Sequence, residues 1–116
     1  LFTNGSSFLV YPFRIVWLTE PSGSEHPVQV LISVPKKRFK RAVDRNLIKR
    51  RIRELYRLHK SEYLLPFLNE HSSGLILGIT YIGNEIGEYA FLDKKFKDAL
   101  HRLKKLYLSN HAEKDI

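Results

Sequence analysis

The stretch from Lys36 to Lys60 constrains this chain more than any other, because it gathers most of the positive charge into one short segment. It holds twelve of the 20 Lys and Arg residues but only two of the twelve acids, Asp44 and Glu54. Its net charge is therefore +10, and the rest of the chain, with eight Lys or Arg against ten acids, is left at −2. Charge concentrated in this way indicates a polyanionic partner.

On a helical wheel, at about 100° per residue, this segment separates into two sides. The cationic side holds Lys49, Lys60, Arg53, Asn46, Arg57 and Arg50 at adjacent positions. The largely apolar side holds Leu55, Ile48, His59, Ile52 and Tyr56. The pattern predicts a helix from shortly after Pro35 to about Lys60, with one side packed on a core and the other open to a partner.

The cations of this helix are spaced so that they repel one another. Arg45, Lys49, Arg53 and Arg57 follow each other at intervals of four residues, and each such pair costs about a few tenths of a kcal/mol. A bound phosphate backbone would relieve that repulsion. The alternative is a solvated surface face with no partner, but such faces usually mix both signs of charge, so we favour the polyanion.

The totals indicate one domain over residues 1–116 with a modest core, because the chain has 116 residues and 43% of them are apolar. The absence of cysteine suits a reducing cytoplasm. No apolar run approaches the roughly 20 residues of a membrane span. The chain also lacks Met and opens at Leu1, so we expect that its natural N-terminus is missing.

Three apolar stretches are typical of strands. Residues Ser6 to Thr19 are rich in aromatic and β-branched side chains and predict two strand pieces interrupted at Pro12. Residues Val28 to Val34 alternate and predict a half-buried strand, which we expect to pair antiparallel with the first. Residues Gly74 to Ile82 are almost continuously apolar and predict a central strand covered on both faces.

Helical patterns complete the chain. Asp93 is expected to cap a last helix. The apolar positions of that helix are Phe96, Ala99, Leu100, Leu103, Leu106 and Tyr107. We expect residues 1–4 to end a helix before Gly5, and residues 61–69 to add a helical turn.

The order of elements indicates an α+β fold: a small mixed sheet of about four strands packed with helices, with a βαβ crossover through the basic helix. Such crossovers are usually right-handed.

No catalytic constellation is evident in the sequence. The five histidines are scattered without metal-ligand spacing, and no serine lies in a nucleophile elbow. The closest pair of acids is Glu85 with Glu88, in a glycine-rich loop. Binding is better supported than catalysis.

Aromatic residues near the expected sheet are candidates for stacking on unpaired bases, which contributes about 1 to 3 kcal/mol per base. They are Phe2, Phe8, Tyr11, Phe13 and Trp17. Core packing is the alternative, which we favour for Phe13 and Trp17, while both interpretations stay open for Phe2 and Phe8.

The sequence RNLIKRRIRE, from Arg45 to Glu54, resembles the signature RNxxKRxxRE of the bacterial ribonuclease P protein component. Lys36, Lys37, Ala42 and Val43 before it are similar too, as is the FxxG formed by Phe2 and Gly5. The resemblance extends over essentially the whole chain. It implies a short N-terminal helix, a small sheet and two further helices, with an uncommon left-handed crossover around the signature helix.

The resemblance also implies a function. The RNA subunit of ribonuclease P would cleave precursor tRNA with Mg²⁺, which the RNA and the substrate mainly hold, and this chain would supply no catalytic residue. The protein would bind the 5′ leader in a cleft beside the sheet, contact the RNA subunit through the signature helix and strengthen metal affinity. No protein partner would be required, and no membrane would be involved.

Most of the site residues follow position by position from the resemblance. Arg57 is added from the wheel, and Phe8 and Trp17 are added from the aromatic residues near the expected sheet. The RNA-binding residues are Lys36, Lys37, Arg41, Arg45, Asn46, Lys49, Arg50, Arg53 and Arg57. The residues of the leader cleft are Phe2, Phe8 and Trp17. Two positions depart from the family: Leu47 stands where many members have a basic residue, and Val16 where an aromatic side chain often faces the leader.

Two other functions remain open at this point. An architectural RNA-binding protein of the ribosomal type would use the same cationic face without any role in cleavage. A nuclease acting alone would cleave RNA with Mg²⁺ and no added RNA subunit.

Overall fold

The computed structural model describes residues 6–20, 28–63 and 74–114. In chain order, the elements are β1 (Ser6–Val10), β2 (Phe13–Glu20), β3 (Val28–Ser33), α1 (Ala42–Tyr63), β4 (Gly74–Tyr81) and α3 (Tyr89–Lys114). The described part of the chain thus has the α+β composition that the sequence predicts. The expectations for residues 1–5 and 64–69 lie outside the described residues.

The strands form one sheet in the order β1-β2-β4-β3. Antiparallel pairing joins β1 to β2 and β2 to β4, and parallel pairing joins β3 to β4. The expectation that residues 28–34 pair antiparallel with the first strands is therefore wrong. The more continuously apolar β4 takes the place beside β2, and β3 is left as an edge strand parallel to β4.

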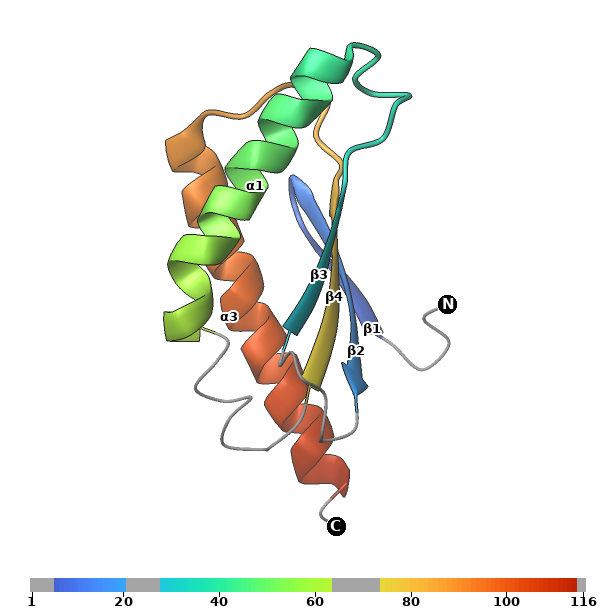
Figure 1. The fold of residues 1–116 in the computed structure, drawn as a ribbon. Coiled ribbons are helices and arrows are strands. Elements are labelled where there is room, and N and C mark those ends of the chain that lie inside the picture. The colour runs from blue at the N-terminus through green and yellow to red at the C-terminus, as the bar shows by residue number, and fades with distance from the viewer. Residues whose placement is uncertain (1–5, 21–27, 64–73, 115–116) are drawn as a thin grey trace.

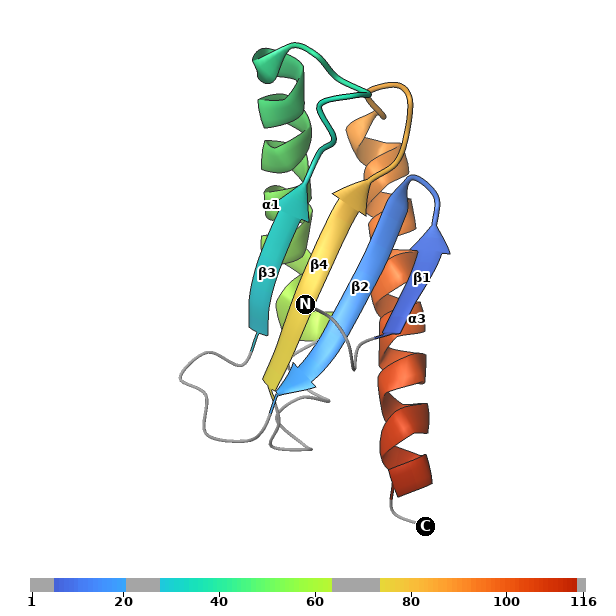
Figure 2. The same ribbon diagram turned by 90° about the vertical axis from the view of Figure 1, so that its right-hand side faces the viewer.

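Both helices cover the same face of the sheet, as Figures 1 and 2 show. Along β4, Leu75, Leu77, Ile79 and Tyr81 are buried while the alternate residues are half-buried. The predicted coverage of β4 on both faces is therefore not found among the described elements. We call the face that α1 and α3 leave uncovered the open face.

The crossover from β3 through α1 to β4 is left-handed, as the family resemblance implies. With the sheet in front, β3 and β4 both run upward, β4 lies to the right of β3, and α1 lies behind them (Figure 2). The usual right-handed rule fails here. The consequence for the site is that α1 covers the β3 side of the sheet while α3 covers the β1 side.

The core lies between the sheet and the two helices. Ile48, Ile52 and Leu55 of α1 are fully buried, as the wheel predicts. The predicted apolar positions of α3 are also buried or half-buried. At the centre, the ring of Phe13 packs edge-on against that of Phe96, with centroids 5.6 Å apart. Neither helix combines the length and apolar character needed to cross a lipid bilayer.

Asp93 of α3 makes a polar contact with α1. The last helix begins at Tyr89, so Asp93 does not cap it, and instead its Oδ1 lies 2.6 Å from Nε2 of His59 in α1. Asp93 Oδ2 also lies 3.2 Å from Lys97 Nζ. The hydrogen bond with His59, followed by that with Lys97, holds the pKa of the Asp93 carboxyl below its ordinary value of 3.8.

Asp93→Asn should lower the free energy of unfolding near neutral pH by about 1 kcal/mol or less, because the pair is partly solvated. A depressed carboxyl pKa contributes stability above the unfolded pKa, and this contribution is lost as the pH falls through the folded one. The difference between the two proteins should therefore shrink as the pH falls below about 4 and disappear only below the folded pKa of Asp93. Urea unfolding across this pH range measures it, and a difference that persists in acid would contradict the ionic contribution of Asp93.

Candidate nucleic-acid interface

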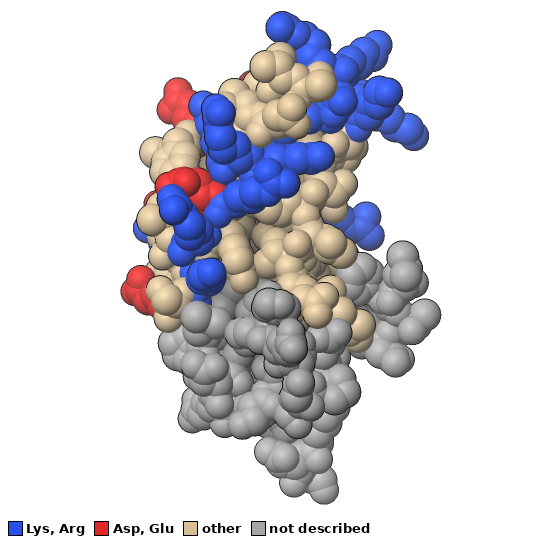
Figure 3. Space-filling model, viewed as in Figure 1, with Lys and Arg blue, Asp and Glu red and all other residues tan. Residues whose placement is uncertain are grey.

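We define the cationic face of α1 as Asn46, Lys49, Arg50 and Arg53. Asn46, Arg50 and Arg53 are exposed and Lys49 is half-buried. Within residues 6–20, 28–63 and 74–114, none of the three cations forms an ion pair. Lys and Arg side chains gather over α1 and over the segment before it (Figure 3). This face can therefore meet phosphates without first breaking an internal salt bridge.

Arg57 differs from these residues because it has an acidic neighbour. Its Nη2 lies 2.9 Å from Oε1 of Glu54, three residues earlier in the helix. Both side chains are largely exposed, and such a pair contributes about 0 to 1 kcal/mol. A phosphate could replace Glu54 at little cost, but we expect Arg57 to add less to RNA affinity than Arg53.

Arg45, the first residue of the signature, is turned toward the protein backbone. Its Nη1 donates hydrogen bonds to the carbonyl oxygens of Phe39, at 2.8 Å, and Lys40, at 2.9 Å. It lies in the first turn of α1, and the two carbonyls belong to the segment that precedes the helix. Arg45 therefore fixes the shape of that segment, a role that its sequence position alone does not reveal.

The segment before α1 carries the other predicted cations. Lys36, Lys37 and Arg41 are exposed. A turn, in which the amides of Arg38 and Phe39 donate to the Pro35 carbonyl, holds the segment. The Phe39 side chain anchors it in the core, 7% exposed. Together with Arg45, these contacts present the cations from an ordered backbone.

Replacing Arg45 by Ala should lower the free energy of unfolding by about 1 to 2 kcal/mol, because two carbonyls lose a charged donor. RNA affinity should fall because the segment loosens. The slope of log K against log [salt] should change little, since each phosphate contact adds about 0.7 to 0.9 to it and Arg45 is occupied by carbonyls. Titrations at several salt concentrations measure the slope. A drop of a full unit would show that Arg45 contacts a phosphate instead.

Phe8 and Trp17, two of the aromatic residues predicted for a leader cleft, do not present a ring on the open face. Trp17 is 2% exposed and lies beside Tyr107 of α3, with ring centroids 6.2 Å apart. Phe8 is 7% exposed, and its ring lies under the Arg102 guanidinium at 5.2 Å. The prediction is therefore wrong for Trp17, and Phe8 offers no free ring face. Phe2 lies outside the described residues.

The alternation of the strands explains this outcome. Phe13, Ile15 and Trp17 share the inner face of β2, so the core interpretation of Phe13 and Trp17 is confirmed. Val16 is half-buried on the other side, at the position where the family often has an aromatic residue. On the open face, β2 therefore has Val16 in place of an aromatic side chain.

Sequence reasoning missed two cations, Arg14 and Arg38, at the open face. Arg14 is exposed and pairs in register with Leu9 of β1, which is 57% exposed. These residues, with Ser7, Phe8 and Ile82, line a depression of about 410 Å³. The sequence does contain a clue to Arg14, because it stands between Phe13 and Ile15. Side chains alternate along a strand, so Arg14 points to the face opposite these two core residues. An apolar surface with arginines at its border suits an unpaired RNA strand.

Comparison with known proteins agrees with this geometry. Residues 1–78 match the family model described as Ribonuclease P. The ribonuclease P protein component of Porphyromonas gingivalis (strain ATCC BAA-308 / W83) is 37% identical over 106 residues, which cover 89% of this chain and 74% of that protein.

Two solved structures share the fold. The ribonuclease P protein from Thermotoga maritima has a TM-score of 0.68 at 21% identity, covering 87% of this chain and 86% of that one. The ribonuclease P protein of Staphylococcus aureus has a TM-score of 0.65 at 25% identity, covering 89% and 84%.

Proposed function

Because this chain belongs to the ribonuclease P protein family, we propose that it is the protein subunit of a bacterial ribonuclease P and binds the RNA subunit through the cationic face of α1. One observation carries the proposal. The signature RNLIKRRIRE forms a helix whose cations Lys49, Arg50 and Arg53 have no acidic partner in the described part of the chain, while its other side packs in the core.

The 5′ leader of precursor tRNA is proposed to cross the open face. The exposed Leu9 and Leu31 offer apolar contact there, and Arg14 and Arg38 are available for phosphates of the strand. This arrangement replaces Phe8 and Trp17, which the sequence suggested for the cleft. The half-buried Val16 offers apolar contact on the same face but no stacking.

Cleavage is proposed to take place in the RNA subunit, with Mg²⁺ held by that RNA and the substrate. The proposal assigns no metal ligand to the protein, and across the described ranges no group of three or more His, Asp or Glu side chains is placed to hold a metal ion. The cations of α1 would assist by reducing the repulsion between phosphates, which is also a task of the metal. A role in tRNA maturation places the protein in the cytoplasm.

Reconstitution tests the proposal. The chain is added to a bacterial ribonuclease P RNA at a low Mg²⁺ concentration, and the rate at which precursor tRNA yields its mature 5′ end is measured. We expect cleavage to rise when the protein is added, and no cleavage by the protein with Mg²⁺ alone. Cleavage without the RNA subunit would favour a nuclease acting alone.

The architectural alternative is separated by affinity. The chain, combined with the RNA subunit, should bind precursor tRNA more tightly than mature tRNA, because the open face contacts the leader. Equal affinity for the two would contradict the role in processing and favour an architectural RNA-binding protein.

A further inference from the structure

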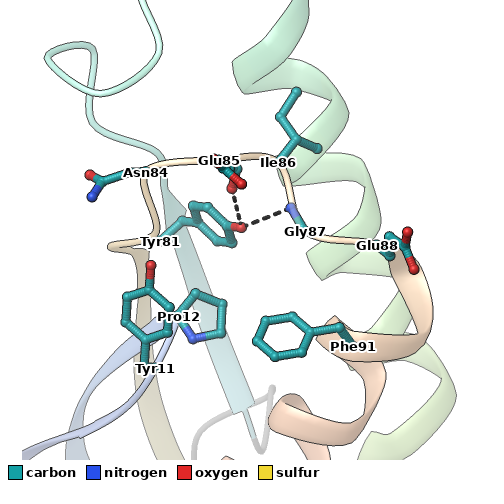
Figure 4. Close-up of a pocket in the computed structure, with 9 residues that line it drawn as sticks. All are labelled: Tyr11, Pro12, Tyr81, Asn84, Glu85, Ile86, Gly87, Glu88 and Phe91. Carbon is teal, nitrogen blue, oxygen red and sulfur yellow. Dashed lines mark hydrogen bonds between the residues drawn. The ribbon is translucent and has the colours of Figure 1, made fainter.

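A second, larger hollow lies at the end of the sheet, and no residue of the cationic face of α1 lines it. It has a volume of about 640 Å³. Its walls are Tyr11 and Pro12 between β1 and β2, Tyr81 at the end of β4, the loop of residues 84–88, and Phe91 in the first turn of α3 (Figure 4). The function proposed above makes no use of it.

The hollow is held in shape by hydrogen bonds within the protein. The Tyr81 hydroxyl donates to the Glu85 carbonyl at 2.7 Å and accepts from the Gly87 amide at 3.1 Å (Figure 4). Arg51 of α1 donates to the Gly87 carbonyl at 2.7 Å. A Cβ on Gly87 would lie 2.9 Å from Leu92 Cδ2, so the loop packs tightly there. A ligand would therefore meet a preformed site and bind with little ordering cost.

The side chains around the hollow have three kinds of chemistry. Tyr11 and Phe91 keep 56% and 42% of their surface exposed, which leaves apolar area for a flat ligand. Glu85 and Glu88 supply carboxylates that form no ion pair with any described residue. Such carboxylates accept hydrogen bonds and repel a phosphate placed directly in the hollow.

The third kind is positive charge at the border. Arg38 Nη1 donates to Asn84 Oδ1 at 2.5 Å, and Lys95 Nζ lies 5.9 Å from the centre of the Phe91 ring. Arg38 also lines the depression on the open face, so the two sites are neighbours. A ligand that fits has a flat apolar body, hydrogen-bond donors at one edge and an anionic group at the other. A nucleotide in an RNA strand has all three.

We propose that this hollow binds one unpaired nucleobase of an RNA strand that leaves the open face over the end of the sheet. The base stacks on Tyr11 or Phe91, donates N–H groups to Glu85 or Glu88, and keeps its phosphate near Arg38. Guanine is the preferred base, because its N1–H and N2–H₂ lie side by side and match the two oxygens of one carboxylate. The inference rests on the proposed function only in that RNA is the ligand.

The test uses the full chain and short, labelled, uridine-rich RNAs that differ at one central position, which is guanine, uridine or abasic. Fluorescence anisotropy measures each dissociation constant. We expect guanine to bind about tenfold more tightly than the abasic RNA. Replacing both Tyr11 and Phe91 by Ala should reduce that ratio to below about twofold. Replacing both Glu85 and Glu88 by Gln should remove the preference for guanine over uridine.

Tyr89→Ala is the matched control, because Tyr89 is an aromatic residue 39% exposed at the start of α3 that does not line the hollow. It should keep the tenfold ratio. Equal binding of the guanine and abasic RNAs, or an unchanged ratio in the Tyr11 and Phe91 variant, would overturn the proposal. Hexalysine tests a cationic peptide as the competing ligand. If hexalysine shifts the NMR signal of the Gly87 amide and the guanine RNA does not, the hollow binds cationic peptides and the proposal is overturned.

The two proposals fail separately, because the binding assay contains no ribonuclease P RNA. Guanine discrimination without any stimulation of precursor tRNA cleavage would overturn the proposed function and leave the base site in place. Stimulated cleavage of precursor tRNA with equal binding of the guanine and abasic RNAs would overturn the base site and leave the proposed function in place.

Discussion

Replacing Lys49, Arg50 and Arg53 together by Ala should weaken binding to ribonuclease P RNA about a hundredfold, at about 1 kcal/mol for each lost contact. The slope of log K against log [salt] should fall by about two to three units, because three phosphates keep their counterions. The fold should survive, since Arg50 and Arg53 are exposed and Lys49 is half-buried. Binding titrations over a range of salt concentrations measure both effects.

A matched control removes the same charge from another helix. Lys94, Lys104 and Lys105 are exposed on α3, and replacing all three by Ala changes the net charge of the protein equally. This variant should keep most of the affinity and of the salt slope. If both variants lose affinity alike, the protein binds RNA through its overall charge, and the cationic face of α1 has no special role.

Phe96→Ala should lower the free energy of unfolding by about 3 to 5 kcal/mol, the usual effect of removing a buried ring. Phe96 is fully buried at the centre of the core, and its ring packs edge-on against Phe13. Small domains have about 5 to 15 kcal/mol of stability in total, so this variant should be close to unfolding. Urea denaturation followed by circular dichroism measures the change.

Phe91→Ala is the control for the core, because Phe91 belongs to the same helix and is 42% exposed. It should lower the free energy of unfolding by less than about 1 kcal/mol. An equal loss in the two variants would contradict the placement of Phe96 at the centre of the core.

The helices were the most predictable part of the fold. Ile48, Ile52 and Leu55 recur at helical spacing and all lie in the core, because the period of an α-helix fixes which side chains share a face. The partner of β3 was not predictable in the same way. Alternation shows that residues 28–33 form a strand, but pairing depends on the path of the chain between strands.

The aromatic residues of the sheet show a second limit. The sequence shows which residues of β2 share a face, because side chains alternate along a strand. Both faces of β2 carry apolar residues, however, so the pattern alone does not show which face the helices cover. The structure places Trp17 toward α3 and Val16 on the open face. The burial of Trp17 beside Tyr107 supports its core interpretation over its assignment to the leader cleft.

The arginines show why the candidate site was only partly predictable. A guanidinium group suits a phosphate and a backbone carbonyl equally well, so the sequence could not show that Arg45 binds the carbonyls of Phe39 and Lys40. Arg14 and Arg38 lie in different segments, and only the order of strands in the sheet brings them to one depression. The cationic face of α1 was predictable because one helix contains all of it.

Cleavage of the RNA subunit by a radical source attached to α1 tests the central claim most directly. The chain contains no cysteine, so Asn46→Cys and Leu58→Cys each carry a single attachment point for an iron chelate. Asn46 belongs to the cationic face, whereas Leu58 is 53% exposed on another side of α1. We predict strong, localised cleavage of ribonuclease P RNA from position 46 and little from position 58. Equal cleavage from both positions, or none from position 46, would contradict the binding of RNA by this face.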